Sequence, residues 1–439
     1  MTHFAFVSSP LAGHVNPLLT LAGELVRRGH RATFVHQADA AALVARSPVA
    51  FAAVGNGTHP AGSLGVSVRR MARLGVVSGI RDMIRDVATT TGMLCRELPD
   101  AYRALGVEAV VADQMEPAGG LVARHLRLPF VTTATGLPIN RELGVPPPYV
   151  PWGYRDMALW RRLNLGGWRV TDLLMREVNR TIRDHAAAFG LTGLTRTEDC
   201  FSPVAQVAQC VRGLDFPRRE LPASFHYLGP FRKAGLGEVE LDETDGRPLV
   251  YCSLGTIQGS RGEIFEAVAR ACHELDLRLL IAHGGRLDPA MAARLPGAPI
   301  VRDFVPQRAV LARASLVIGH AGFNTVLDAL SFGVPMVAMP LAFEQPATAA
   351  RLRRAGVAEV LYGRFTRARL KRAIARVLGE SAYRLRAHAF ASEIAAAGGV
   401  GGAADIIEGA LGLGARREAA TKKATAFDGA RGGSRSENR

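Results

Sequence analysis

Residues 302–351 decide the fold, and they read RDFVPQRAVLARASLVIGHAGFNTVLDALSFGVPMVAMPLAFEQPATAAR. Residues 316–319 predict a short buried strand, and the turn at 320–325 opens an apolar-periodic helix. Gly333-Val334-Pro335 ends this helix and starts the next strand. Strands and helices that alternate in this way are typical of a parallel sheet covered on both faces.

The turn that opens this helix has the chemistry of a phosphate site. The first helical N–H groups and the positive end of the helix dipole point back at the turn. Gly322 allows a ligand to approach the backbone closely. Asn324 and Asp328 are four positions apart and therefore share one helix face. A phosphate-binding turn with a carboxylate one turn further along suits a nucleoside diphosphate and its ribose.

The regions around this stretch predict two units of the same kind. The first unit opens with a strand at 4–9 and an apolar-periodic helix that Gly29 ends, and the second opens at Pro248. Residues 229–247 are Gly-rich and acidic, as linkers are. We expect two Rossmann-like, doubly wound α/β domains that face each other across a cleft. The expected boundaries are 1–228 and 248–415 for the domains, 229–247 for the linker, and 416–439 for a disordered basic tail. The further expected strands are 31–36, 51–54, 108–112, 130–133, 277–282 and 335–338.

Length, composition and charge fit an ordinary globular protein. The 439 residues are 48% hydrophobic, so two or three domains can each bury a core. The formal charge is +15, but only four of the 54 basic residues are lysines. An arginine-biased genome accounts for this charge better than nucleic-acid binding, because the arginines are spread along the chain rather than clustered with aromatic residues. We therefore expect no nucleic-acid partner.

Several kinds of site lack support in the sequence. The five cysteines form no CxxC pair and no zinc-ligand spacing, and no Asp-x-Asp occurs, so we expect no metal. No Gly-x-Ser-x-Gly, His-Glu-x-x-His or Walker loop is present, and no Gly-x-Gly-x-x-Gly follows the first strand. The N-terminus has no basic segment before its apolar residues, which favours a cytoplasmic protein over a secreted one.

Two residues of the first unit form a candidate catalytic pair. His14 stands in Gly-His-Val-Asn-Pro after the first strand, and Asp113 follows the strand near residue 110. A lone histidine in a loop is more often held by structural hydrogen bonds, and an aspartate at a strand end can cap the next helix. A histidine beside a buried carboxylate is also the arrangement of a general base and its orienting partner.

These motifs resemble the signature of the UDP-glycosyltransferases, which are inverting enzymes with the two-domain GT-B fold. The family pattern contains an aromatic-x-Pro-Gln, a His-x-Gly-x-Asn-[Ser/Thr], an acid four positions after the Asn, a Gly-Val-Pro and a closing acidic-Gln pair. All five occur here in that order between residues 304 and 345. Two positions depart from it: Phe304 stands where many members have Trp, and Glu344 stands where Asp is usual. The longer acid leaves the donor sugar open.

The resemblance implies a role for each matching residue. His14 would take the proton from an acceptor hydroxyl, and Asp113 would stabilise the resulting imidazolium. UDP-glucose would be the donor, held without a metal or a bound cofactor. The residues implied to contact it, in order from uracil through ribose and diphosphate to sugar, are Phe304, Val305, Gln307, Asp328, Thr256, His320, Gly322, Asn324, Thr325, Glu344 and Gln345.

The segment 155–183 favours a hydrophobic acceptor. It carries seven arginines, three acidic residues and a run of leucines, and Trp152, Trp160 and Trp168 fall in or beside it. This composition is typical of a helix that lies on an anionic membrane surface. Lining an acceptor pocket or packing in the domain core would explain the same residues, and both interpretations stay open.

Within this family, the chain is most similar to bacterial zeaxanthin glucosyltransferases, and the stretches that carry this similarity are 113–123, 128–130, 137–142, 324–329 and 341–346. These enzymes transfer glucose from UDP-glucose to the ring hydroxyls of a carotenoid, giving the mono- and then the diglucoside. Such an activity predicts a cytoplasmic enzyme that contacts the inner membrane face. The alternatives are transfer to another lipophilic alcohol, such as a sterol, hopanoid or macrolide, and a UDP-sugar 2-epimerase, which would have no use for the apolar segment.

Overall fold

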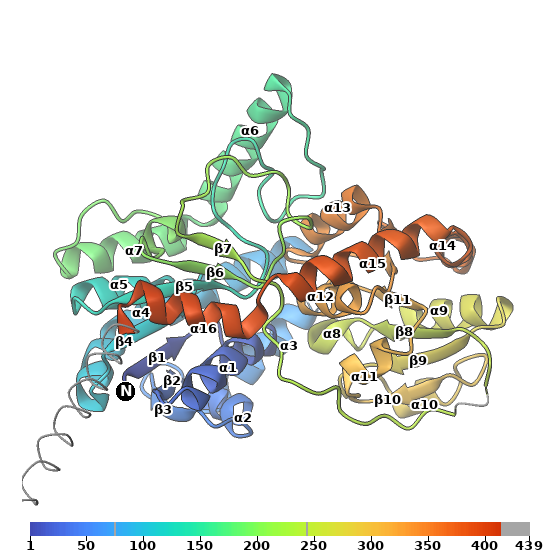
Figure 1. The fold of residues 1–439 in the computed structure, drawn as a ribbon, viewed down its shortest axis with the longest axis horizontal. Coiled ribbons are helices and arrows are strands. Elements are labelled where there is room, and N and C mark those ends of the chain that lie inside the picture. Colours follow the sequence, from blue (N-terminus) through green and yellow to red (C-terminus); the bar gives the residue numbers. More distant parts are fainter. Residues whose placement is uncertain (74–75, 243–244, 414–439) are drawn as a thin grey trace, which may run out of the picture.

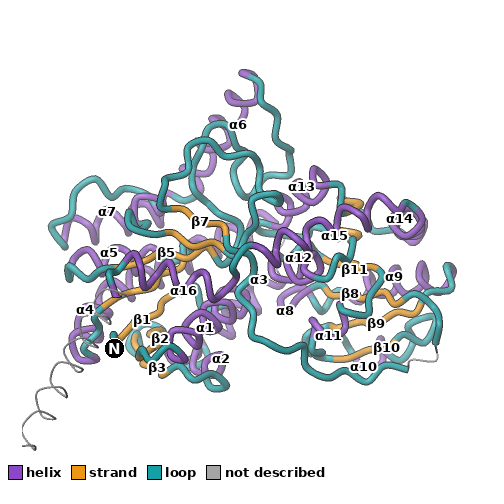
Figure 2. Tube along the Cα trace, viewed as in Figure 1, coloured by secondary structure: helices purple, strands orange, loops and turns teal. Residues whose placement is uncertain are grey.

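The computed structural model describes residues 1–73, 76–242 and 245–413, which form two α/β domains side by side (Figure 1). The tail expected to be disordered, 416–439, lies outside the described residues. In each domain, helices enclose one sheet (Figure 2), and every strand pairing is parallel. Two doubly wound domains are therefore confirmed.

The first domain is built on a seven-stranded sheet of order β3-β2-β1-β4-β5-β6-β7. The central strands β1, β4 and β5 are wholly buried, which explains their apolar sequences. The strands are β1 His3–Val7, β2 Arg31–Gln37, β3 Ala50–Val54, β4 Ala109–Asp113, β5 Phe130–Ala134, β6 Gln206–Ala208 and β7 Phe225–Tyr227. The helices are α1 Ala12–Arg27, α2 Ala41–Val44, α3 Ser63–Arg73, α4 Val76–Leu105, α5 Pro117–His125, α6 Ala158–Leu174 and α7 Arg176–Ala188, with short 3₁₀ turns at Ala38–Ala40 and Thr197–Cys200.

The second domain is built on a six-stranded sheet of order β10-β9-β8-β11-β12-β13. Its strands are β8 Leu249–Ser253, β9 Arg278–Ala282, β10 Ile300–Arg302, β11 Leu316–Gly319, β12 Met336–Ala338 and β13 Ala358–Val360. Its helices, with those that follow, are α8 Gly255–Gln258, α9 Gly262–Glu274, α10 Pro289–Ala292, α11 Gln307–Leu311, α12 Phe323–Ser331, α13 Gln345–Ala355, α14 Arg367–Gly379, α15 Ser381–Ala396 and α16 Gly399–Ala410. The decisive strand 316–319 and the helix after it are β11 and α12, as predicted.

The last helix returns to the first domain. Residues 381–410 are long enough to span a membrane, and an 18-residue window within them reaches a mean hydropathy of 1.2. In the structure they are two helices separated at Gly398, whose φ is 89°. Helix α15 packs on α12 of the second domain, and α16 packs on α1 of the first (Figure 1), where Arg28 pairs with Asp405 at 2.5 Å. The stretch 248–415 therefore does not fold wholly onto the second sheet.

The two domains share a packed interface. One apolar cluster joins residues of the first domain, such as Leu137 and Leu214, to residues of the second, such as Phe323. A buried ion pair crosses the same interface, with Arg351 Nη2 2.8 Å from Asp215 Oδ1. Burial opposes the charge of Asp215, but Arg218 and Arg351 hold its pKa at about 2. This contact fixes how the two strand edges that carry the candidate site residues face each other.

Candidate active site

Helix α1 and the ends of two neighbouring strands place the candidate catalytic pair. His14 lies in the first turn of α1, directly after β1. Asp113 is the last residue of β4, which is paired with β1. The two residues meet because parallel neighbours end at the same edge of a sheet: His14 Nδ1 lies 3.4 Å from Asp113 Oδ1. The Asp113 side chain is 1% exposed, whereas that of His14 is 22% exposed and can reach a substrate.

A hydroxyl group that the sequence analysis missed links the two. Thr135, one residue beyond β5, lies with its Oγ1 2.8 Å from His14 Nδ1 and donates a very short hydrogen bond to Asp113 Oδ2. The cap of helix α5 is Glu116, whose side chain accepts from Ala118 N. Asp113 therefore does not cap that helix, and its carboxylate serves Thr135, His14 and the turn at Met115.

The carboxylate sets the basicity of His14. Burial disfavours the imidazolium, but the charge and hydrogen bond of Asp113, helped by Glu344 of the second domain, raise the pKa of His14 above its ordinary value. With the Nδ1 hydrogen directed at Thr135 and Asp113, Nε2 is the nitrogen left for a substrate. This is the geometry of a general base with its orienting carboxylate.

The proline of the Gly-His-x-x-Pro motif has a structural consequence at the domain interface. Pro17 lies inside α1 and has no N–H to donate to the carbonyl four residues back, which is that of Gly13. That carbonyl instead accepts a 2.7 Å hydrogen bond from Asn324 Nδ2 at the start of α12. The residue implied to bind phosphate thus also connects the second domain to the helix that carries His14.

The turn between β11 and α12 is shaped around the ring of His320. A Cβ on Gly322 would lie 2.3 Å from His320 Nε2, and one on Gly255 would lie 2.9 Å from the same ring. Only glycine fits at these two positions. Burial lowers the pKa of His320 to about 4, although Ser253 O accepts a 3.4 Å hydrogen bond from its Nδ1. His320 is therefore neutral near pH 7 and supplies hydrogen bonds rather than positive charge at this turn.

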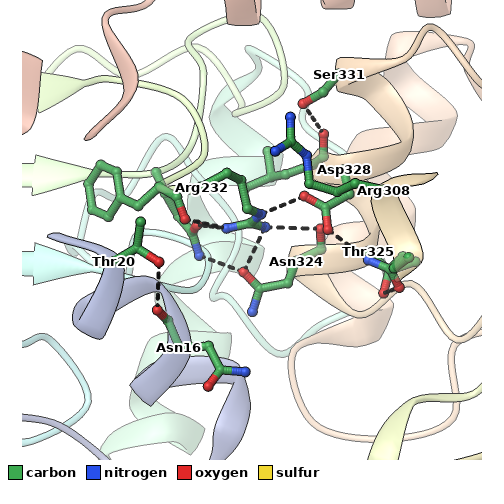
Figure 3. Close-up of polar contacts among 12 residues, drawn as sticks. Asn16, Thr20, Arg232, Arg308, Asn324, Thr325, Asp328 and Ser331 are labelled. Carbon is green, nitrogen blue, oxygen red and sulfur yellow. Dashed lines mark hydrogen bonds and ion pairs between the residues drawn. The ribbon is translucent and has the colours of Figure 1, made fainter. Parts of the chain in front are cut away.

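Four of the residues implied to bind the donor belong to one polar network (Figure 3). They are Gln307, Asn324, Thr325 and Asp328. Gln307 Nε2 donates to Asp328 Oδ2 at 2.7 Å, and its Oε1 accepts from Thr325 at 3.2 Å. The network also contains Arg232, which no sequence motif indicated. Its guanidinium lies between Asn324 and Asp328 (Figure 3), with Nε 2.5 Å from Asp328 Oδ1.

Phe304, Val305 and Thr256 lie apart from this network. Phe304 follows β10, and its side chain is among the exposed large hydrophobic groups at 69%. Val305 next to it is half-buried, and Thr256 is exposed at the start of α8. An exposed aromatic ring beside the strand ends suits stacking on a nucleobase.

Glu344 and Gln345 stand at the start of α13. Burial raises the pKa of Glu344, and the charge of His14 in the other domain opposes this rise. The side-chain oxygen of Gln345 accepts from Leu341 N and Ala342 N, both at 2.9 Å. Only the amide NH₂ of Gln345 is then left for a ligand.

A small pocket of about 90 Å³, partly open to solvent, adjoins the loop between β1 and the helix that carries His14. Its walls come from the loop after β1, from α3 and α4, and from the residues after Asp113, rather than from the segment 155–183. The residues lining it include Pro10, Leu11, Leu64, Met83, Val87 and Met115. In the described part of the chain, no group of three or more His, Cys, Asp or Glu side chains is placed to hold a metal.

Comparisons with known proteins identify the family of this chain. The family model described as UDP-glucoronosyl and UDP-glucosyl transferase matches residues 93–392. A zeaxanthin glucosyltransferase from Pantoea ananas is 40% identical over 93% of this chain and 96% of its own length. A second, from Pseudescherichia vulneris, is 40% identical over 94% and 98%.

A solved structure shows a similar fold. The crystal structure of the calicheamicin glycosyltransferase CalG4 superposes with a TM-score of 0.75, at 24% identity over 94% of this chain and 98% of its own. Two Rossmann-like domains of this kind are the GT-B architecture. The family model covers well over half of the chain and the 40% identical relatives nearly all of it, so the protein is an enzyme of the UDP-glycosyltransferase family.

Proposed function

We propose that the protein transfers glucose from UDP-glucose to the ring hydroxyls of a carotenoid, converting zeaxanthin to its mono- and diglucoside. The observation that carries this proposal is the 40% identity, over nearly the whole chain, to two enzymes named zeaxanthin glucosyltransferases. The contact of His14 with Asp113, which raises the pKa of His14, supports the chemistry.

In the proposed reaction, His14 Nε2 takes the proton of the acceptor hydroxyl as its oxygen attacks the anomeric carbon of glucose. The new bond joins that oxygen to the anomeric carbon, and the bond from this carbon to the β-phosphate oxygen breaks, with the electron pair leaving on UDP. Attack on the face opposite to UDP inverts the configuration. Asp113 stabilises the imidazolium that forms, as in other base–carboxylate pairs. The N–H groups at the start of α12 stabilise the charge on the leaving diphosphate.

The test is an assay of the purified protein with UDP-glucose and zeaxanthin in vesicles, read by mass spectrometry. A product heavier than zeaxanthin by one and then two glucosyl groups supports the proposal. If UDP-glucose is consumed only with a sterol, hopanoid or macrolide, the carotenoid is wrong and the transferase activity stands. Parallel assays with UDP-galactose and UDP-glucuronic acid test which sugar is transferred. The choice of sugar is open because Glu344 stands where the family usually has Asp. Conversion of a UDP-sugar alone to an epimer would contradict transfer.

The pH dependence of the reaction tests the catalytic pair. The base must be neutral to accept a proton, so the rate rises with pH through the pKa of His14. Because Asp113 raises that pKa, the midpoint lies above the ordinary value for histidine, and Asp113→Asn moves it to lower pH while reducing the rate. Thr135→Val keeps the carboxylate and is the control: the plateau falls but the midpoint stays above the ordinary value. Unchanged midpoints in Asp113→Asn would remove Asp113 from this role.

We also propose that α6 holds the enzyme on an anionic membrane surface. The helix projects away from both sheets (Figure 1). Its exposed apolar side chains follow helical spacing along the face opposite to buried Asn164 and Trp168. They are Leu159, Leu163, Val170, Leu173 and Leu174, with Met157 just before the helix. The exposed Arg162 and Arg169 flank this face, and their charge favours anionic lipid.

Two of the three tryptophans of this region, Trp152 and Trp168, pack at the base of α6 and do not belong to its exposed apolar face. Trp168 is 2% exposed beneath the guanidinium of Arg141, at 4.6 Å. Trp152 Nε1 donates to Asn164 Oδ1 at 3.1 Å. They anchor α6 at its base, and the leucines are the groups left to enter a bilayer.

Binding to vesicles tests the membrane surface. Burial of each leucine contributes about 1.5–3 kcal/mol, so Leu159→Glu/Leu173→Glu is expected to weaken binding to phosphatidylglycerol-containing vesicles at least about 100-fold. UDP binding should be unchanged. Leu385→Glu is the matched control, since that side chain is 67% exposed on α15. Equal vesicle binding by the double variant and the unmodified protein would contradict the proposal, as would equal binding to neutral phosphatidylcholine vesicles.

A further inference from the structure

Arg232 lies just after β7, where the chain leaves the first domain, and its guanidinium is fully used. An arginine side chain has five N–H groups, and each has an acceptor. Its side chain is 17% exposed and that of Asp328 only 8%. The five contacts are Nε to Asp328 Oδ1 at 2.5 Å, Nη1 to Gln209 Oε1 and to Phe231 O, both at 3.0 Å, and Nη2 to Asn324 O at 3.3 Å and Asn324 Oδ1 at 3.1 Å.

Asp328 keeps capacity for a ligand despite these contacts. A carboxylate accepts about four hydrogen bonds. Arg232 takes one site on Oδ1, and Gln307 takes one on Oδ2. One lone pair on each oxygen remains, in a carboxylate that is fixed on both sides. Two adjacent hydroxyl groups of a ribose match this arrangement.

The same guanidinium braces Asp328 against the first domain. Gln209, wholly buried one residue beyond β6, accepts from Arg232 and donates from Nε2 to Asn324 Oδ1 at 2.9 Å. Its Nε2 also makes a short hydrogen bond to the carbonyl of Thr135, whose hydroxyl contacts the catalytic pair. A continuous set of hydrogen bonds therefore runs from the carboxylate in one domain to the surroundings of His14 in the other.

We propose that Arg232 is a positioning residue for donor recognition: it orients the carboxylate of Asp328 toward the ribose hydroxyls and holds it at a fixed place relative to the first domain. The inference rests on the proposed function, in which Asp328 binds the ribose of UDP-glucose. Lysine cannot replace Arg232, because an ammonium has three donors at one point and cannot reach acceptors on both domains at once.

The test compares UDP with 2′,3′-dideoxy-UDP, which lacks both ribose hydroxyls, by calorimetry on the full chain. The unmodified protein should prefer UDP by about 10- to 100-fold, the value of hydrogen bonds to a fixed charged acceptor. In Arg232→Ala this preference should disappear, with the affinity for dideoxy-UDP held within about threefold. KM for UDP-glucose should rise by the same factor while kcat stays within about threefold. Arg232→Lys should resemble Arg232→Ala. Lys233→Ala, at the exposed neighbouring position, is the control and should bind as the unmodified protein does.

The other possible outcomes distinguish an error in the role of Arg232 from an error in the proposed donor. Unchanged UDP affinity in Arg232→Ala overturns the inference, and so does an equal loss for both nucleotides, which would instead mark a contact with the diphosphate. Failure of the unmodified protein to bind UDP overturns the proposed donor itself. Gln209→Met keeps the contact of Arg232 with Asp328 but removes the brace, and provides a second variant should Arg232→Ala fold poorly. It should lose part of the preference for UDP, and retention of the full preference would exclude the brace.

Discussion

His14→Ala is expected to lower kcat about 1,000-fold, within the range that a positioned general base contributes, while UDP binds with unchanged affinity. The reason is geometric: Asp113 and Thr135 both contact Nδ1 of His14, so neither is placed to accept the proton that Nε2 would take. The nucleotide is expected to lie on the second domain, which the substitution leaves intact.

The measurement pairs single-turnover kinetics with calorimetric titration of UDP. His273→Ala is the control, because that histidine is exposed on α9 of the second domain. Turnover within tenfold of the unmodified enzyme would remove His14 from the role of base. A parallel loss of UDP affinity would indicate that the substitution disturbs the contact between Gly13 and Asn324 rather than the chemistry.

The second large effect is expected on the donor side, from Asp328→Asn. The amide has one acceptor oxygen in place of two, so it cannot accept from Arg232, from Gln307 and from two ribose hydroxyls together. Loss of charged hydrogen bonds, each worth about 1.5–3 kcal/mol, predicts a rise of about 100-fold in KM for UDP-glucose. The value of kcat at saturating donor should change little.

Asp184→Asn provides the comparison, since that carboxylate is 70% exposed on α7, away from the site. A kcat defect in Asp328→Asn without a change in KM would place Asp328 in the chemical step and contradict a role in ribose binding. Together, the two variants should separate the reaction into a base on the first domain and a nucleotide site on the second.

Much of the fold follows from local sequence. The stretch 302–351 specifies strand, turn and helix by its apolar pattern and glycines, and the structure has β11 and α12 at those residues. Strands β6, β7, β10 and β13 were not predicted. Each has three residues, too few for a periodic pattern, and none follows a Gly-Val-Pro such as the one that marked the equally short β12. Nor does the sequence show that α16 leaves the second domain, because an apolar helix face does not state what it packs on.

The candidate site also contains some residues that could be predicted from the sequence and others that could not. His14 and Asp113 follow recognisable strands, so their meeting at one sheet edge could be predicted. Thr135 follows the neighbouring strand, and extending the same argument by one strand would have found it. Arg232 could not be found in this way, because it stands in an expected linker and its partner Asp328 is 96 residues away. The neutral state of His320 depends on burial, which only the folded chain reveals.

The return of α16 to α1 also bears on how the chain is made. The core of the first domain includes Ala403, Ile407 and Leu413 beside Leu18 and Phe34. Because synthesis proceeds from the N-terminus, the first domain cannot complete its core until the last described residues leave the ribosome, after the second domain has emerged whole. The second domain is in effect an insertion within the first. A chain cut short at residue 398 should therefore damage the domain that was begun first, exposing the apolar side of α1 and leaving the helix that carries the base without its cover.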